Sequence, residues 1–346
     1  MRGVKVKNSW VLLCTAILLG VTLFVASPSP TQSPVANPAP KTPAKVIELT
    51  YNCIFAEGTI GAMAQKKWCD EVQKRSGGHL KIKFYPSGTL YHYKPSEAAL
   101  AAGELDASQF AGFTMGQIVQ TVALPCLFDS WDQVKKFHRE GGMNLIAKGV
   151  SSCNMRPLFA IPFASITGIF RKPVHTLDDL KGLKLRSPTA QLIAYLKRLG
   201  ATSVHVATTE VYQALQLGTI DGVISTTESF YKRKWYEGAR YFLNTPLGLY
   251  VHYSMISLKK WDSLPPDIQN LMLEVGEEVE DWLYEEVGKY DDEIRRKLSG
   301  LLETHSLPPY EYSRWVERAK SVWDEWAKKG PEYEQAVKLA RQITGK

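Results

Sequence analysis

The sequence predicts an α/β fold made of two lobes with a cleft between them. A strand–helix–strand pattern occurs in two places, and both copies end in the phrase A-L-x-x-G-x-[L/I]-D, at residues 99–106 and again at 214–221. The chain has 346 residues, of which 45% are apolar and 22% charged. That composition is typical of globular proteins, and the length is enough for two medium-sized units that each bury a core.

The first copy begins with residues 46–52, where apolar and polar side chains nearly alternate, as in a half-buried strand. A helical pattern follows over about 59–75 and stops at Gly77-Gly78. Residues 79–85 alternate again and predict a second strand. A second helix from about Pro95 ends in the first phrase, after which 107–110 predicts a short buried strand.

The second copy is built in the same way. Residues 182–186 and 203–206 predict short strands on either side of a helix over about 190–199, and a helix over 208–217 ends in the second phrase before a strand at 222–225. In each phrase a glycine that can adopt positive φ ends the helix, and a tight turn leads into the strand. We therefore expect one lobe from about 46–164 with part of 250–280, and the other from about 165–249 with the C-terminal helices.

The pattern changes after Asn244. Residues 247–258 predict a long strand that could cross between the lobes, and Pro265-Pro266 starts a long helix that continues to about residue 298. Two further helices, over about 309–328 and 331–343, give an α-rich tail. The tryptophans of these helices recur at helical spacing, which indicates packing.

The N-terminus predicts export. Three basic residues precede an uncharged stretch at 10–26, which fits either a cleaved signal peptide or a retained membrane anchor within residues 1–26. Residues 27–45 contain six prolines and predict an extended linker. If 10–26 is retained, it would tether the protein to the membrane.

The net charge of +7 does not indicate nucleic acid. Five basic and no acidic residues lie in 1–45, so residues 46–346 carry 37 basic against 35 acidic side chains. The exported part has four cysteines, Cys53, Cys69, Cys126 and Cys153, which we expect to be mostly buried thiols, with one disulfide permitted by the compartment. Histidines are scattered, so neither a metal site nor a cofactor is expected.

The chemistry in the sequence is that of recognition. The motifs of serine hydrolases, P-loop nucleotide-binding proteins, zinc peptidases and dinucleotide-binding enzymes are all missing. In contrast, Leu180–Pro188 predicts a strand that ends at Arg186, on the edge where open α/β sheets bind ligands. A guanidinium there offers a planar, permanently charged fork that matches a carboxylate.

Six segments in this order resemble the solute-binding proteins of tripartite ATP-independent periplasmic (TRAP) transporters, of the DctP type. The segments are 76–90, 103–106, 124–128, 177–186, 210–216 and 218–221, and the resemblance covers about residues 46–340. It implies a periplasmic-binding-protein-like fold (type II) with a long helix spanning both lobes. It also implies a monomer that captures an organic acid outside the cytoplasmic membrane and passes it to the permease subunits of the membrane.

In that family the arginine of the G-L-K-[I/L]-R motif pairs with the ligand carboxylate, and here this residue is Arg186. A second arginine is common about twenty residues earlier, where this chain has Ile166, and a common asparagine is replaced by Ser225. These departures favour a monocarboxylate with an apolar or aromatic body. The remaining candidate ligand contacts are Thr208, Thr227, Asn52, Phe55, Glu57 and Phe110, the last of which fits core packing better than ligand binding.

Two other functions remain open at this point. A secreted enzyme could use Cys53, Glu57 or His79 in the same cleft, although no third group to orient them is visible. A receptor that presents the solute to a membrane sensor would differ only in its partner.

Overall fold

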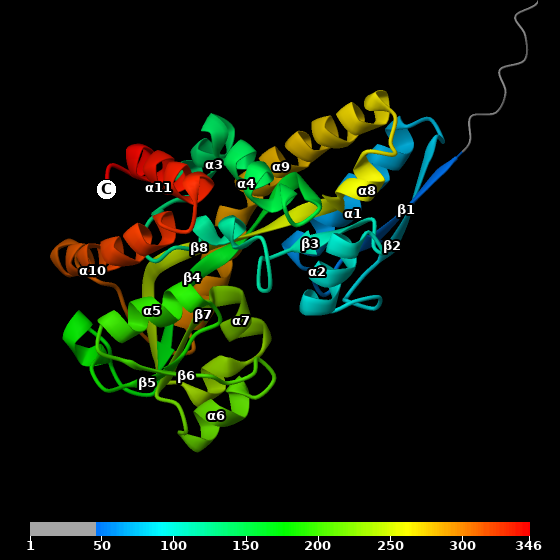
Figure 1. The fold of residues 1–346 in the computed structure, drawn as a ribbon. Coiled ribbons are helices and arrows are strands. Elements are labelled where there is room, and N and C mark those ends of the chain that lie inside the picture. Colours follow the sequence, from blue (N-terminus) through cyan, green and yellow to red (C-terminus); the bar gives the residue numbers. More distant parts are fainter. Residues whose placement is uncertain (1–45) are drawn as a thin grey trace, which may run out of the picture. The chain divides into compact units, whose positions relative to one another are not determined.

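The computed structural model describes residues 46–346, and in this part nine strands form one mixed sheet (Figure 1). The strand order is β2-β1-β3-β8-β4-β7-β5-β6, with β9 beside β8. The strands are β1 (Ile47–Asn52), β2 (Leu80–Tyr85), β3 (Ala107–Phe110), β4 (Met155–Phe170), β5 (Lys184–Arg186), β6 (Thr202–Val204), β7 (Gly222–Thr226), β8 (Tyr241–Ser257) and β9 (Glu303–His305). The short strands at the two ends of the sheet are parallel, as predicted, and the central pair β4–β8 is antiparallel.

Helices cover both faces of this sheet. They are α1 (Ile60–Arg75), α2 (Tyr93–Ala102), α3 (Trp131–Phe137), α4 (Met143–Ser151), α5 (Ala190–Arg198), α6 (Val211–Leu217), α7 (Thr227–Lys232), α8 (Leu258–Trp261), α9 (Pro266–Ser299), α10 (Pro309–Ala327) and α11 (Pro331–Thr344). All the predicted helices are therefore confirmed, with shifts of a few residues at their ends. Within the described residues, none of the helices is long and apolar enough to span a membrane.

The repeated phrase has the same structure in both places. Gly103 ends α2 with φ 69°, and Gly218 ends α6 with φ 72°, so both glycines occupy the left-handed region. The aspartate of each phrase then accepts a hydrogen bond from the strand beside it: Asp106 from the Thr50 amide and Asp221 from the Lys184 amide, both at 2.8 Å. The two α/β units thus end in the same hydrogen-bonded turn.

The central strands differ from the prediction. No strand was expected at 155–170, yet β4 is sixteen residues long, and β8 starts at Tyr241 rather than at 247. The pairing of β4 with β8 shifts register at three places, one of them between Pro162 and Ala164. In Figure 1 these two strands run from the β1–β3 end to the β7–β5 end, so they join the lobes. The strand that was expected to cross between the lobes is therefore confirmed as β8, and its pairing with β4 was not expected.

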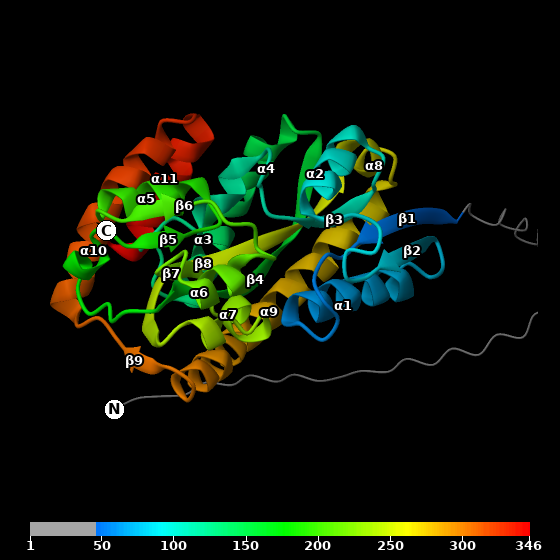
Figure 2. The same ribbon diagram turned by 90° about the horizontal axis from the view of Figure 1, so that it is seen from below.

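Helix α9 packs along the same strands. Its first part belongs to a hydrophobic cluster with β1, β2 and α1, and its last turns, with Ile294 and Leu298, belong to a cluster with β7 and α6. Figure 2 shows α1 beside α9. Gly276 lets the helix approach β4 closely, since a Cβ there would lie 2.8 Å from the Leu158 carbonyl oxygen. The expected long helix spanning both lobes is confirmed.

Two buried carboxylates fix α9 to β4 on either side of the Pro162 register shift. Glu280 accepts a hydrogen bond from the Ala160 amide at 2.9 Å. Asp291 accepts three, from the Ser165 amide at 3.2 Å, the Ser165 hydroxyl at 2.6 Å and the Thr227 hydroxyl at 2.5 Å. The helix is therefore held to both halves of the strand by hydrogen bonds as well as by apolar packing.

The contact of Glu280 with β4 is expected to make the stability of the protein depend on pH. Burial raises the pKa of Glu280 to about 7, although the Ala160 amide acts in the opposite direction. Because the folded state binds the proton more tightly, this stability is fully present only below pH 4.5, the ordinary pKa of the group, and it is lost as the pH rises from there through 7. Gln at position 280 cannot ionise. The free energy of unfolding of Glu280→Gln minus that of wild type should therefore be larger at pH 8 than at pH 5, by on the order of 2–3 kcal/mol.

Urea unfolding of both proteins at pH 5 and pH 8 measures this difference. Glu274, which is also exposed on α9 and is not among the charges that act on Glu280, supplies the control, because Glu274→Gln should follow wild type at both pH values. The pKa of Glu280 is also affected by the charges of Arg139, Asp281 and Glu277, and His138 Nδ1 lies 3.9 Å from its carboxyl group. All four groups are still present in the Gln variant. Equal pH dependence in wild type and Glu280→Gln would show that Glu280 does not titrate in this range.

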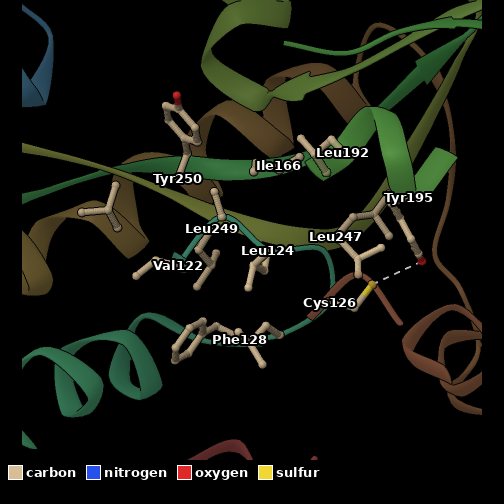
Figure 3. Packing of buried hydrophobic residues seen from close by; sticks show 14 of the residues in the cluster. Val122, Leu124, Cys126, Phe128, Ile166, Leu192, Tyr195, Leu247, Leu249 and Tyr250 are labelled. Atoms are coloured by element: carbon tan, nitrogen blue, oxygen red, sulfur yellow. Dashed lines mark hydrogen bonds between the residues drawn. The ribbon is translucent and has the colours of Figure 1, made fainter. Parts of the chain in front are cut away.

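The opposite face of the sheet carries the largest hydrophobic cluster. Figure 3 shows part of it, where Leu124 and Val122 pack below Leu249 of β8. The α10 tryptophans lie in this cluster, with the indole nitrogens of Trp323 and Trp326 donating to the Pro125 carbonyl and the Thr121 hydroxyl. This confirms their role in packing.

The four cysteines of the described chain are all free. Cys53, Cys69 and Cys126 are buried and Cys153 is half-buried. Burial raises the pKa of the Cys53 and Cys126 thiols to about 12, and that of Cys69 well above its ordinary value. The expectation of buried thiols is met, and the permitted disulfide does not form.

Candidate functional site

Arg186 ends strand β5 and is 5% exposed. Its Nε donates to the Val206 carbonyl at 3.2 Å, and Nη2 donates to the Thr208 hydroxyl at 3.0 Å. The guanidinium carbon lies 5.7 Å from the ring centre of Trp235. These contacts hold the plane of the guanidinium in one orientation, and they leave Nη1 without a hydrogen-bond partner among residues 46–346.

The charge of Arg186 has no anionic partner within the described chain. Burial lowers its pKa to about 10, and the positive charge of Arg233 at the end of α7 acts in the same direction. The group is therefore still a cation at neutral pH, in surroundings that disfavour a cation. A buried charge of this kind is stabilised strongly by an opposite charge that enters its surroundings.

The segment after Arg186 adds further polar groups. Ser187, Thr189 and Gln191 are all at least nine-tenths buried, and each has a side-chain oxygen without a partner in the described chain. Gln191 also donates through Nε2 to the Gln120 side chain at 2.8 Å, which links α5 to the segment before α3. Thr189 precedes α5, but its side chain does not cap the helix. The hydroxyls of Ser187 and Thr189 can donate to or accept from a molecule held by Arg186, and the Gln191 amide oxygen can accept.

Aromatic side chains from four elements gather beside β8. His252 lies at the centre, with its ring 4.9 Å from Phe55, 5.4 Å from Phe163, 5.0 Å from Tyr250 and 5.9 Å from Tyr93. Phe55 and Phe163 stack with ring centroids 4.9 Å apart and an angle of 12°. These residues come from the loop after β1 and from α2, β4 and β8.

The structure brings together some of the sequence candidates. Thr208 binds Arg186 directly, and Phe55 belongs to the aromatic group. Ser225 is buried at the end of β7, two residues before the N-terminus of α7. Glu57 is exposed on the loop before α1.

Three other candidates are used inside the protein. Asn52 is fully buried, and its side chain bonds to Tyr91, Ser96 and Ser108. The Thr227 hydroxyl donates to Asp291. Phe110 lies in the core next to Gly116. The roles of these residues in solute binding stay predictions.

Several residues of the site were missed by sequence reasoning, namely Trp235, Ser187, Thr189, Gln191, Tyr250, His252 and Glu228. Glu228 lies in the first turn of α7, where burial raises its pKa to about 7 and one carboxyl oxygen has no partner in the described chain. The alternation of polar side chains at 187, 189 and 191, and at 250 and 252, is the signal that could have found five of these seven. Trp235 and Glu228 have no such signal.

No group of three or more potential metal ligands occurs among residues 46–346. Two depressions lie along α9, and Arg186 lines neither of them. One, of about 360 Å³, is lined by Asn244 and Arg295 among others, and one, of about 190 Å³, by Met63 and Tyr290 among others. The groups around Arg186 can bind and orient an anion.

Comparison with known proteins identifies the family. Residues 53–329 match the family described as bacterial extracellular solute-binding protein, family 7 (DctP). The chain belongs to this family. As a family 7 solute-binding protein it is a binding protein rather than an enzyme, as the sequence predicted, and the extracellular description agrees with the predicted export. The predicted segments 1–26 and 27–45 lie outside the described residues.

Individual relatives are similar to this chain in sequence or in fold. This family 7 protein is 28% identical over 313 residues to the C4-dicarboxylate-binding periplasmic protein DctP of Rhodobacter capsulatus, covering 86% of this chain and 92% of that protein. A TRAP periplasmic solute binding protein from Rhodoferax ferrireducens, with bound malonate, has a TM-score of 0.76 at 22% identity and covers 86% of this chain and 98% of its own.

A third relative has the same fold. The Bordetella pertussis extracytoplasmic solute receptor DctP7, which binds pyroglutamic acid, has a TM-score of 0.76 at 19% identity and covers 86% of this chain and all of its own. These similarities confirm the predicted two-lobed α/β fold for the family 7 protein.

Proposed function

We propose that this protein is the extracytoplasmic solute-binding subunit of a TRAP transporter, which captures an organic acid between its lobes and delivers it to an ion-gradient-driven permease. It would act in the periplasm or at the outer face of the cytoplasmic membrane, as a monomer. The observation that carries the proposal is Arg186: a buried, oriented guanidinium that has no carboxylate partner among residues 46–346.

The site favours a single carboxylate at Arg186. Ile166, at the place where relatives carry a second arginine, is 1% exposed and pairs with Thr226 and Gly248 in the sheet, so it offers no charge to a second carboxylate. The oxygens of Ser187 and Thr189 extend the polar end of the site, and Phe55 and Phe163 supply apolar walls. The relatives that bind malonate, pyroglutamic acid and C4-dicarboxylates support an organic acid as the solute class.

The proposed mechanism is closure of the two lobes on the solute. The acid docks its carboxylate on Arg186, the lobes approach, and water is excluded, which strengthens the ion pair because the local dielectric constant falls. The strands β4 and β8 join the lobes, so closure bends this pair at its register shifts, while α9 follows through its Glu280 and Asp291 contacts. The closed surface is then the form that the permease recognises.

Ligand recovery tests the proposal. The protein is purified under native conditions, unfolded in acid, and the released small molecules are identified by mass spectrometry, with a boiled-buffer blank and the same preparation of Arg186→Met as controls. We expect an unmodified organic acid that is enriched with wild type and missing from Arg186→Met. Recovery of a neutral sugar or of a cation, or of the same acid in equal amount from both proteins, would contradict the proposal.

A further inference from the structure

Tyr250 and His252 lie two residues apart on β8 and therefore face the same side of the sheet. They are 7% and 2% exposed, and their rings are 5.0 Å apart. The Tyr250 hydroxyl and His252 Nδ1 both lack a hydrogen-bond partner among residues 46–346. In Figure 3 the Tyr250 hydroxyl points away from the packed cluster below β8. Buried polar atoms without partners on two neighbouring side chains are unusual, because each is costly to bury unpaired.

The next residue on the same strand shows that the chain can satisfy such groups. Tyr253, on the opposite face, bonds through its hydroxyl to His138 Nε2 at 2.8 Å. His138 Nδ1 bonds in turn to the Tyr284 hydroxyl at 2.6 Å. This Tyr–His–Tyr chain is fully paired inside the protein. The unpaired atoms of Tyr250 and His252 contrast with this paired chain on the other face of the strand.

Aromatic rings frame this pair. Phe55 and Phe163 stack against each other, and both meet the His252 ring nearly edge to face, at 74° and 78°. Tyr93 completes the frame, and its hydroxyl accepts a hydrogen bond from Gln109 at 3.3 Å. Flat π systems pack favourably against such faces and edges. The frame therefore suits a planar molecule with a polar atom at its end.

The charge of Arg233 acts on both Arg186 and the aromatic frame. Arg233 is close enough to both Arg186 and Tyr93 for its charge to affect the pKa of each. Burial lowers the pKa of His252 to about 3, so at neutral pH the imidazole is uncharged and offers one donor and one acceptor. The pKa of Tyr250 is raised, so its hydroxyl stays protonated.

We propose that Tyr250 and His252 form a second recognition point for the solute, which binds a hydroxyl or carbonyl oxygen on a planar, ring-containing acid, at the end opposite the carboxylate held by Arg186. A solute hydroxyl accepts from one of the two side chains and donates to the other, and a carbonyl oxygen accepts from both. This inference rests on the proposed function, because it takes the carboxylate position from Arg186. If it holds, tight binding requires that the solute carry a hydroxyl or carbonyl oxygen at the end opposite its carboxylate.

Pairs of acids that differ by one hydroxyl test this second recognition point, with the affinity of the ligand-free protein for each acid measured by calorimetry. Benzoate, phenylacetate and 3-phenylpropanoate are compared with their 4-hydroxy derivatives, so that three spacings between carboxylate and hydroxyl are covered. Wild type should prefer the hydroxylated member at the best spacing by about tenfold or more. Tyr250→Phe and His252→Phe keep the rings and should bring this preference close to unity. Tyr253→Phe, on the same strand but the other face, is the control and should keep it.

The outcomes separate the two proposals. Equal binding of hydroxylated and parent acids, an unchanged preference in both Tyr250→Phe and His252→Phe, or no binding of any of the six acids to wild type overturns the inference. Loss of all acid binding in Arg186→Met with no preference for the hydroxyl leaves the proposed function standing and removes only the second recognition point. Equal binding of the acids by Arg186→Met and wild type removes the carboxylate position itself.

Discussion

Replacing Arg186 by alanine is expected to weaken binding of the acid recovered from the wild-type protein by ~3–5 kcal/mol, or about a hundredfold to several thousandfold. The variant leaves the carboxylate buried without its cation. It also frees the Val206 carbonyl and the Thr208 hydroxyl that now accept from the guanidinium. Titration calorimetry at constant pH and salt measures the loss. Arg186→Lys should recover only part of it, since an ammonium cannot form two parallel bonds to a carboxylate.

Arg198 provides a matched control for this experiment. It lies on α5 in the same lobe and pairs with Glu325 at the surface, so Arg198→Ala should bind like wild type. Unfolding without ligand separates binding from folding: because Arg186 is a buried cation without an anionic partner, Arg186→Met should unfold at the same temperature as wild type or higher. Full affinity in Arg186→Ala would place the carboxylate elsewhere in the protein.

Asp291→Ala is expected to lower the free energy of unfolding by about 3–5 kcal/mol. The substitution leaves the Ser165 amide, the Ser165 hydroxyl and the Thr227 hydroxyl buried without their acceptor, and each unpaired buried donor costs ~1–3 kcal/mol, in part relieved by rotation of the hydroxyls. Equilibrium urea unfolding measures the change. Asp292, the exposed next residue of α9, is the control, and Asp292→Ala should change stability by less than about 0.5 kcal/mol.

A double-mutant cycle with Thr227→Val tests the same contact. Since both substitutions remove one hydrogen bond in common, the double variant should be less destabilised than the sum of the two single variants. Strict additivity would mean that Thr227 and Asp291 do not interact in solution, and the clamp would then rest on Ser165 alone.

Local patterns account for what the sequence predicted correctly. The strand–helix–strand units are encoded by periodicity, by the glycines at 103 and 218, and by the aspartates that close each unit, all of which act over a few residues. Strand β4 lacks such a signal. It is buried along nearly its whole length, so its side chains do not alternate, and Pro157, Pro162 and Gly168 interrupt it at positions where the pairing with β8 shifts register.

The candidate site likewise has residues that the sequence predicts and residues that it does not. Arg186 was identified from its position at the end of a predicted strand and from the resemblance. Thr208 was one of the candidate ligand contacts, and the structure joins the two residues by a hydrogen bond. Trp235 reaches Arg186 only through the turn after α7, and Phe163 reaches Phe55 only because β4 passes the loop after β1. Asn52 illustrates the reverse case. Its position at the end of β1 suggested a ligand contact, yet the serines at 96 and 108 and the backbone of Tyr91 take up its hydrogen bonds.

The burial of three of the four thiols has a practical consequence for following this protein in motion. Alkylating dyes react with thiolates, and Cys53, Cys69 and Cys126 are shielded and hard to deprotonate in the folded state. A dye added to a chain without residues 1–45 will therefore label Cys153 first, in the turn between α4 and β4, at the base of the strand that joins the lobes. Cys153 is therefore a native position for a label. The rate at which the other three thiols react measures how often the fold opens.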